Sequence, residues 1–309
     1  MCSDRAEAVL LGVAIGDALG WPVEFRDLPA IKAAYGPAGI SELPDPALFT
    51  DDTQMSMALA EGVLGAGVDA DLDVIMQSVG GQFARWHARQ SEPGYARAPG
   101  SSCMAGSARF AGGVPWRQSG GENSKGCGAA MRVAPLGYLY QHEAARLKEV
   151  AAASAVITHR HPAAIASAVG AAFAVKLALD GVPVSGLLRG VDEATRGLSD
   201  EFSNTLLRVG HAGGWADEEA AMQHIGEGWL GDEAVALALY CVTRYPDDYA
   251  ACVRRGANMT GDSDSVASIA GGIVAARLGL EAIPAAWRDR IEERAALAGL
   301  TARMSAARS

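Results

Sequence analysis

The stretch Gly261–Leu278, GDSDSVASIAGGIVAARL, places two aspartates directly before a run of small and aliphatic residues. The apolar positions recur at helical spacing and predict an α-helix from Ser265 to Leu278. Aspartate and serine are also preferred residues at the start of a helix. This stretch therefore predicts a helix that carries oxygen ligands at its N-terminus, Asp262, Asp264 and Ser265.

A second acidic cluster has the same layout. The residues Thr50-Asp51-Asp52-Thr53 stand just before the pattern TQMSMALAEGVL, which predicts a helix from Thr53 to Leu64. Either cluster alone is more often a helix cap, because acidic groups in a first turn also suit the helix dipole. A cap needs only one side-chain oxygen, whereas the two clusters together supply four carboxylates and several hydroxyls.

An all-oxygen ligand set of this kind is what Mg²⁺ and Mn²⁺ prefer. Two such ions about 3.5–4 Å apart share carboxylates and clamp a reacting group. This hypothesis requires two helix starts more than 200 residues apart in the sequence to meet in the fold.

Charge and composition narrow the class of protein. The 309 residues carry 26 basic and 36 acidic side chains, a formal charge of −10, and show no basic run of the kind that nucleic acid requires. Five scattered cysteines without a CxxC pair indicate neither a disulfide framework nor a structural zinc site. The apolar segment Pro162–Leu179 is rich in alanine and predicts a buried helix rather than a membrane span. We expect a cytoplasmic protein without a nucleic-acid or membrane partner.

Helical patterns recur along the whole chain, and none of the segments shows convincing strand alternation. Half of the residues are hydrophobic, alanine and glycine are plentiful, and no linker or repeat divides the chain. We predict an all-α fold in a single domain, residues 1–309, with long site-lining loops at Glu24–Phe49 and Ser91–Lys125. The further predicted helices are Ala6–Leu19, Val74–Arg89, Glu143–Ile157, Pro162–Leu179, Asp217–Ile225, Glu233–Thr243 and Tyr249–Asn258.

Three other features are candidates for chemistry. Glu24 lies among apolar residues after a glycine-rich helix end, where burial would let it act as a base. The alternative is a partly exposed loop glutamate without a role in chemistry. The small residues Gly126–Ala130 would present backbone N–H groups to an anion, although a tight turn has the same pattern. In Thr158-His159-Arg160-His161, one histidine is a candidate for substrate contact and the other for a cap or the surface. Cys127 is not expected to be a nucleophile, because no motif places a base beside it.

Five segments in this order make the sequence similar to the ADP-ribosylglycohydrolase family, which includes bacterial dinitrogenase reductase-activating glycohydrolases and animal ADP-ribosyl-arginine and ADP-ribosyl-serine hydrolases. The resemblance runs from about Ala6 to beyond Trp287. The five segments are GDALGWPVEF (16–25), TDDTQM (50–55), GCGAAMRVAPLG (126–137), THRHP (158–162) and GDSDSVASIAGGIVA (261–275).

The resemblance implies an all-α fold of orthogonally packed helices and a centre of two Mg²⁺ or Mn²⁺ ions. It implies metal ligation by Thr50, Asp51, Asp52, Asp262, Asp264 and Ser265. It implies that either Glu24 or Asp52 is the catalytic base, and that the substrate is held by Gly126, Cys127, Gly128, Ala129 and His159. Some relatives have asparagine where Cys127 stands and Gly-Asn where Ser101-Ser102 stand, and both departures fall on substrate-facing loops.

The activity that the resemblance implies is hydrolysis of the bond between ADP-ribose and an acceptor, with an ADP-ribosylated protein or a small conjugate as the partner. We expect ADP-ribosyl-arginine as the linkage, with serine-linked ADP-ribose and O-acetyl-ADP-ribose as alternatives. Two other classes remain open at this point: a different metal hydrolase that acts on phosphoesters, and a non-catalytic relative that only binds ADP-ribose or is structural.

Overall fold

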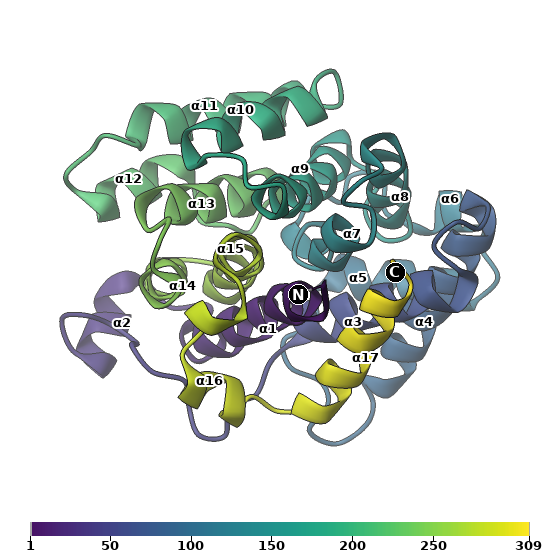
Figure 1. Ribbon diagram of the computed structural model, residues 1–309, viewed down its shortest axis with the longest axis horizontal. Coiled ribbons are helices and arrows are strands. Elements are labelled where there is room, and N and C mark those ends of the chain that lie inside the picture. The colour runs from purple at the N-terminus through teal and green to yellow at the C-terminus, as the bar shows by residue number, and fades with distance from the viewer. Residues whose placement is uncertain (1, 309) are drawn as a thin grey trace.

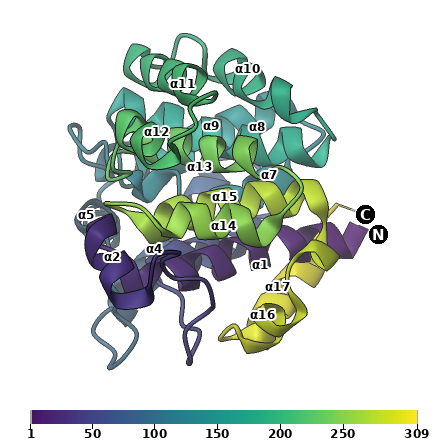
Figure 2. The same cartoon turned by 90° about the vertical axis from the view of Figure 1, so that its left-hand side faces the viewer.

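Two helices from opposite ends of the chain lie against each other at the centre of the molecule. Helix α1 (Cys2–Gly20) packs along helix α15 (Ser263–Leu278), and both views of the ribbon show them side by side (Figures 1 and 2). The structure is a computed structural model that describes residues 2–308. Between residues 2 and 308 it contains helices and a few isolated β-bridges but no strand, which confirms the predicted all-α class.

Glycines allow this pair of helices to approach closely. Gly12, Gly16 and Gly20 recur at every fourth residue and so share one face of α1. A Cβ atom on Gly16 would lie 2.1 Å from the carbonyl oxygen of Ala267, and one on Gly20 would lie 2.4 Å from the Cα of Asp264. The contact is therefore backbone against backbone, and it fixes the end of α1 against the first turn of α15.

The remaining helices surround this pair. Helices α9 and α13–α14 pack on α15, whereas α3, α7 and α17 pack on α1, with α4 outside α3. In chain order their bounds are α2 (Leu28–Tyr35), α3 (Asp51–Ala66), α4 (Leu72–Arg89), α5 (Ser101–Ala111), α6 (Trp116–Ser119), α7 (Ala134–Leu139), α8 (Ala144–Val156), α9 (Pro162–Leu179), α10 (Val184–Thr195), α11 (Asp200–Ala212), α12 (Glu218–Ile225), α13 (Gly231–Arg244), α14 (Tyr249–Ala257), α16 (Ala285–Arg290) and α17 (Arg294–Ala306). Short 3₁₀ turns lie at Trp21–Val23, Cys127–Ala129 and Leu280–Ala282.

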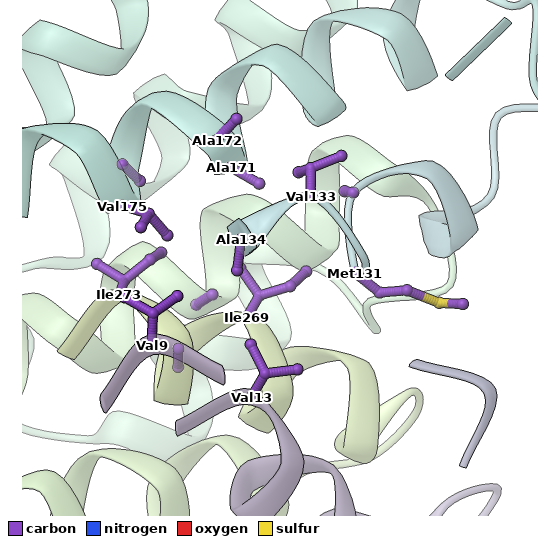
Figure 3. Close-up of a cluster of buried hydrophobic side chains, with 14 of the residues drawn as sticks. Val9, Val13, Met131, Val133, Ala134, Ala171, Ala172, Val175, Ile269 and Ile273 are labelled. Carbon is purple, nitrogen blue, oxygen red and sulfur yellow. The ribbon is translucent and has the colours of Figure 1, made fainter. Parts of the chain in front are cut away.

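The core forms where α1, α9 and α15 meet the segment before α7. Figure 3 shows Val9 and Val13 of α1 facing Ile269 and Ile273 of α15, with Val175 of α9 on the opposite side. Helix α9 and the segment Asp4–Val23 are each long and apolar enough to cross a membrane, but 78% and 83% of the two windows are buried inside the protein. The prediction that Pro162–Leu179 is a buried core helix is therefore confirmed.

Two predicted loops contain helices. Helix α2 lies inside the expected loop Glu24–Phe49 because Asp27 caps it through Ala30 N–H and Pro29 occupies its first turn. The expected loop Ser91–Lys125 contains α5 and the short α6. Helices α10, α11, α16 and α17 also lie in segments for which the sequence analysis predicts no helix. Both acidic helices begin two residues earlier than predicted, at Asp51 and Ser263, so most of the acidic residues lie within the first turn.

Adding a methyl group to the centre of the α1–α15 contact should destabilise the protein. We expect Gly16→Ala to lower the free energy of unfolding by about 1–3 kcal/mol, because its Cβ has no space beside the Ala267 carbonyl. The matched control is Gly81→Ala in α4, where nothing lies within 4 Å of the new Cβ and the better helix propensity of alanine should add up to about 1 kcal/mol. Urea unfolding of both variants measures the difference, and equal stabilities would contradict the close packing.

Candidate functional site

The first turns of α3 and α15 meet. The Thr50 hydroxyl donates to Asp264 Oδ2 at 3.4 Å, and the Ser265 hydroxyl donates to Asp52 Oδ2 at 3.4 Å. Both contacts join residues more than 200 positions apart. The structure thus brings the two acidic clusters together, as the metal-site hypothesis requires.

Asp17 of α1 holds the start of α3 in place. Its carboxylate accepts the backbone N–H of Thr50 at 2.9 Å and that of Thr53 at 3.0 Å, and the Thr53 hydroxyl donates to it at 2.6 Å. Asp17 is fully buried. A carboxylate from a neighbouring helix therefore accepts hydrogen bonds from N–H groups at the start of α3. In most helices, a side chain at the start of the same helix accepts these bonds.

Helix capping, the alternative role of the two acidic clusters, accounts for few of their side chains. At the start of α3 the Thr50 hydroxyl is the cap and accepts from Asp52 N–H, while the Asp51 carboxylate accepts the N–H of Gly100 at 3.1 Å instead. Asp262 occupies the cap position of α15 but makes no side-chain hydrogen bond there. Capping thus leaves the concentration of carboxylates unexplained.

Glu24 completes the acidic group. One carboxylate oxygen from each of Glu24, Asp262 and Asp264 lies within 4.8 Å of the others, a spacing that suits ligation of one cation. Glu24 Oε2 and Asp52 Oδ1 are buried and have no hydrogen-bond partner among residues 2–308. Buried oxygens without a partner are costly, and a divalent cation would satisfy them, so the residues present fit a metal centre.

Burial, together with the mutual repulsion of these acids, raises their pKa values. Burial, followed by repulsion from Asp264, raises the pKa of Glu24 to about 10 and that of Asp17 to about 7. Burial is also the main reason why the pKa of Asp51 rises to about 8 and the pKa of Asp52 lies well above its ordinary value. Bound cations would reverse this effect, because they favour the charged form of each carboxylate.

A cavity of about 340 Å³ opens over the acidic group. Its walls come from the two helix starts, from the segment after α1, from the start of α5 and from the glycine-rich loop. The lining residues are Glu24, Phe25, Asp51, Asp52, Ala98, Pro99, Gly100, Ser101, Ser102, Cys103, Gly126, Cys127, Gly128, Met131, His159, Trp229, Asp262, Asp264 and Ser265. Of the residues predicted to belong to the site, only Thr50 and Ala129 do not line the cavity, and both are buried beneath it.

The glycine-rich loop is placed beside the acidic group, although one of its N–H groups is already used. Cys127 N–H donates to the carbonyl of Trp229 at 3.1 Å, so this amide is not free to bind an anion. The Cys127 thiol points to the acids and donates to Asp262 Oδ2 at 2.8 Å. Gly128 packs against Cys103 and His159, where a Cβ would lie 2.5 Å from the Cys103 sulfur.

His159 is buried in the wall and stays neutral. Burial and the nearby Arg132 guanidinium lower the pKa of His159 to about 3. Arg132 donates to Thr158 Oγ1 at 2.8 Å, and the same hydroxyl lies 2.8 Å from His159 Nδ1 but 3.5 Å from its other acceptor, the Ala155 carbonyl. The Thr158 hydroxyl therefore donates to Nδ1, and the ring proton resides on Nε2, which lies beside Gly126 and Gly128. His159 thus offers one N–H donor to the cavity.

Two aromatic rings border the cavity. Phe25 is 68% exposed and stacks on Trp229 with ring centroids 5.2 Å apart. Phe25 has a φ of 62°, which is strained for a bulky residue, and this strain is typical of functional sites. The stack joins the segment of Glu24 to the loop before α13.

Comparison with known proteins identifies the family. The profile described as ADP-ribosylglycohydrolase matches residues 2–309. The chain belongs to this family. It is 30% identical to an ADP-ribosyl-[dinitrogen reductase] glycohydrolase of Rhodospirillum rubrum over 94% of this chain and 90% of the relative, and 25% identical to the ADP-ribosylarginine hydrolase Tri1 of Serratia proteamaculans over 96% and 78%. A solved structure titled "ADP-ribosylglycohydrolase-related protein complex" superposes with a TM-score of 0.76 at 28% identity and covers 100% of this chain and 99% of that one. The family resemblance and the fold expected from it are confirmed.

The sequence analysis missed several residues that shape this site. Asp17, Arg132 and Thr158 belong to the segments that carry the family resemblance, and Trp229 lies outside all of them, yet none of the four is predicted to have a role. For Asp17 a signal existed, since a lone aspartate inside the apolar run Ala8–Gly20 must find a partner when the helix is buried. For Arg132 and Trp229 the partners come from distant segments, which only the fold identifies.

Removal of the Thr158 hydroxyl should change the protonation of His159. In Thr158→Val we expect the proton to leave Nε2 for Nδ1 in a substantial fraction of molecules, because Nδ1 loses its donor. Long-range ¹H–¹⁵N NMR of the histidine side chains, assigned with His159→Gln, measures the tautomer. Thr195→Val is the matched control, since the hydroxyl of this buried residue donates to the backbone carbonyls of Val191 and Asp192 in α10. The same tautomer in the wild type and in Thr158→Val would contradict the assignment.

Without bound cations, the free energy of unfolding of this protein should fall as the pH rises. The folded state binds more protons than the unfolded chain between the ordinary aspartate pKa of 3.8 and the raised values of about 7 for Asp17 and about 8 for Asp51. The free energy of unfolding therefore falls with rising pH across this window. Saturating Mn²⁺ should abolish that fall, because ion binding favours the charged carboxylates. Urea midpoints in EDTA and in Mn²⁺ from pH 5 to 8 test it, and a midpoint in EDTA that increases with pH would contradict it.

Proposed function

We propose that this protein hydrolyses the glycosidic bond between ADP-ribose and an acceptor, with arginine on an ADP-ribosylated protein as the preferred acceptor and two Mg²⁺ or Mn²⁺ ions as cofactors. One observation carries the proposal: two distant helix starts and Glu24 place five carboxylates around one cavity in a member of this family. The names of the Rhodospirillum and Serratia relatives support the reaction class, and the Serratia name supports arginine.

The ion ligands in this proposal come from the two helix starts. They are Thr50, Asp51, Asp52, Asp262, Asp264 and Ser265, which together offer carboxylate and hydroxyl oxygens of the kind that hard cations prefer. When bound, the ions would orient the ribose hydroxyls, neutralise the crowded carboxylates and activate water. Thr50 lies beneath the cavity, where its hydroxyl contacts Asp264.

The carboxylates also act on the reacting carbon. Departure of the acceptor from the anomeric carbon creates positive oxocarbenium character, which negative side chains around the cavity stabilise. Water then attacks this carbon and passes a proton to a base. Glu24 and Asp52 are the two candidates, because each has a buried oxygen that no described residue hydrogen-bonds.

The far wall of the cavity would hold the rest of ADP-ribose. The Nε2–H of His159 lies beside Gly126 and Gly128, where it can donate to a ribose or diphosphate oxygen. Because Cys127 N–H is engaged by Trp229, Cys127 would contribute its side chain rather than its amide to the site. Ser101 and Ser102 line the same cavity in the first turn of α5, which would face the acceptor.

Release of free ADP-ribose tests the function directly. The purified protein is incubated with an arginine-ADP-ribosylated protein in Mg²⁺, in Mn²⁺ and in EDTA, and the products are separated by chromatography. We expect release that requires metal and leaves the diphosphate intact. Serine-linked ADP-ribose and O-acetyl-ADP-ribose in parallel reactions identify the linkage. Hydrolysis of none of these conjugates, with metal binding retained, would replace the enzyme by a binding or structural role.

Loss of a single ion ligand should nearly abolish turnover. We expect Asp264→Ala to lower kcat/KM by more than about 100-fold and to weaken Mn²⁺ binding, since even outer partners of metal ligands contribute 10–100-fold. The matched control is Asp217→Ala, because this aspartate only caps α12 and should cost about 0.5–2 kcal/mol of stability without a change in rate. A wild-type rate for Asp264→Ala at low metal would contradict the two-ion proposal.

Glu24→Gln separates the two roles that remain for this residue. As a base, Glu24 is needed for turnover but not for metal, so the variant should lose rate while Mn²⁺ affinity measured by calorimetry stays close to that of the wild type. As a ligand beside Asp262 and Asp264, its loss would weaken both. Unchanged turnover would remove Glu24 from the mechanism and leave Asp52 as the base.

A further inference from the structure

A segment near the C-terminus reaches the residues that precede α3. Glu292 N–H donates to the Ala47 carbonyl at 3.1 Å, and Ile291 forms an isolated parallel bridge with Ala47. The Glu292 carboxylate accepts the backbone N–H of Phe49 at 2.6 Å. Because Phe49 directly precedes Thr50, Glu292 fixes the chain at the entry to the first acidic cluster.

Arg97 binds Glu292 at the same place. Its guanidinium donates through Nη1 to Glu292 Oε1 and to the Phe49 carbonyl, and through Nη2 to Glu292 Oε2 at 3.2 Å. The two charged side chains are only 14% and 18% exposed, and the Arg97 Cζ lies 5.7 Å from the centroid of the Trp21 ring. A buried pair with two parallel hydrogen bonds has a more defined geometry than an exposed ion pair. The Arg97–Glu292 pair therefore fixes the path of the chain at Arg97.

The residues that follow Arg97 form part of the cavity wall. The segment Ala98–Gly100 lines the cavity. Ala98 has a φ of 48°, a conformation that a residue with a Cβ keeps only where the surrounding structure holds it. At the other end of the segment, Gly100 N–H donates to Asp51 Oδ2 at 3.1 Å. The segment is thus held by the buried ion pair at one end and by a proposed ion ligand at the other.

We propose that Arg97 and Glu292 are positioning residues, which hold the segment Ala98–Gly100 so that Gly100 orients the Asp51 carboxylate for ion binding and the wall keeps its shape for the substrate. The structural part of this inference does not depend on the reaction. The effect on turnover does rest on the proposed function, because it requires that Asp51 holds an ion needed for hydrolysis.

The hydrogen bond from Gly100 transmits the effect of the ion pair to Asp51. Asp51 is 5% exposed, and a displacement of the segment would remove the donor from its Oδ2. Partners of metal ligands typically contribute about 10–100-fold to metal affinity, because they fix the orientation of the ligand. Since the Arg97–Glu292 pair acts through one such partner, we expect its loss to weaken ion binding by about tenfold, the lower end of this range.

A second ion pair provides the matched control. Arg303 of α17 and Glu61 of α3 also join the C-terminal part of the chain to α3, through two hydrogen bonds of 2.7 Å. Their side chains are 54% and 35% exposed, and neither residue lines the cavity. Loss of the Arg303–Glu61 pair therefore alters the contact between α17 and α3 without reaching Gly100.

Hydrogen exchange of the metal-free protein tests the first step. Exchange is followed by mass spectrometry in EDTA, in peptides that cover residues 95–104, for the wild type, Glu292→Ala, Arg97→Met and Glu61→Ala. We expect exchange in this segment to be faster by about tenfold or more in the first two variants, because the segment opens locally, and to be unchanged in Glu61→Ala. Peptides of the buried helix α9 report global unfolding in the same samples. Wild-type exchange of residues 95–104 in both Glu292→Ala and Arg97→Met would overturn the proposal.

Calorimetry with Mn²⁺ tests the second step. We expect the affinity to fall by about tenfold in Glu292→Ala and in Arg97→Met, and by the same factor in the double variant, because two residues that act as one unit are not additive. Glu61→Ala should bind Mn²⁺ like the wild type. Urea unfolding accompanies each titration, since a purely structural role would lower the stability of the variants and leave the affinity unchanged. That outcome would overturn the positioning role, and Glu292→Gln repeats the test if the alanine variant does not fold.

Turnover is measured separately, so the two proposals can fail independently. In the ADP-ribose release assay, we expect Glu292→Ala and Arg97→Met to need about tenfold more Mn²⁺ for half-maximal rate, as their weaker ion binding implies. If ADP-ribose is released with the same Mn²⁺ dependence in the wild type and in both variants, the proposed function stands and the positioning role fails. If no conjugate is hydrolysed but Mn²⁺ affinity depends on Arg97 and Glu292, the positioning role stands and the proposed function fails.

Discussion

The site depends on the close backbone contact between α1 and α15. Because glycines at every fourth residue of α1 leave no side chain between the helices, the end of α1 lies directly on the first turn of α15. That contact determines the positions of two acidic elements at once. Asp17 projects from α1 to hold the start of α3, and Glu24 follows α1 to the opening of the cavity. A larger residue in the contact would move three parts of the site together.

This arrangement concentrates carboxylates around the cavity, where few positively charged side chains of the protein neutralise them. Arg132 is fully buried, and its two terminal amino groups donate to Ser154, Thr158 and sulfur atoms rather than to a carboxylate. Burial and mutual repulsion therefore keep the pKa values of these acids raised, which favours their protonated forms when no cation is bound. A rigid acidic pocket of this kind sacrifices stability for the ability to bind cations, which is the usual relation between functional sites and their scaffold.

The sequence patterns predict the individual helices of this fold better than the contacts between them. The helical period predicts α1, α3, α9 and α15 because each carries a long apolar run, whereas α2 and α5 lie between glycine- and proline-rich turns that predict loops. The two acidic clusters were recognised by residue type, but only packing shows that Ser265 reaches Asp52. The role of Arg132 could not be predicted, since its partners Ser154 and Thr158 lie more than 20 residues away and bind through a backbone carbonyl and a hydroxyl.

The cavity combines buried first turns with more exposed residues, and under the proposed function these two parts would have different tasks. Asp52 and Asp264 belong to first turns that are fixed by buried hydrogen bonds, so the reacting ribose would meet nearly the same surroundings in any relative with these residues. The acceptor would instead meet Phe25, Ser101 and Trp229, which lie at helix starts or in loops around the opening. Side chains there can change without disturbing α1 and α15. Under the proposed function, substitutions around the opening would therefore change the selectivity for an acceptor while leaving the chemistry at the anomeric carbon intact.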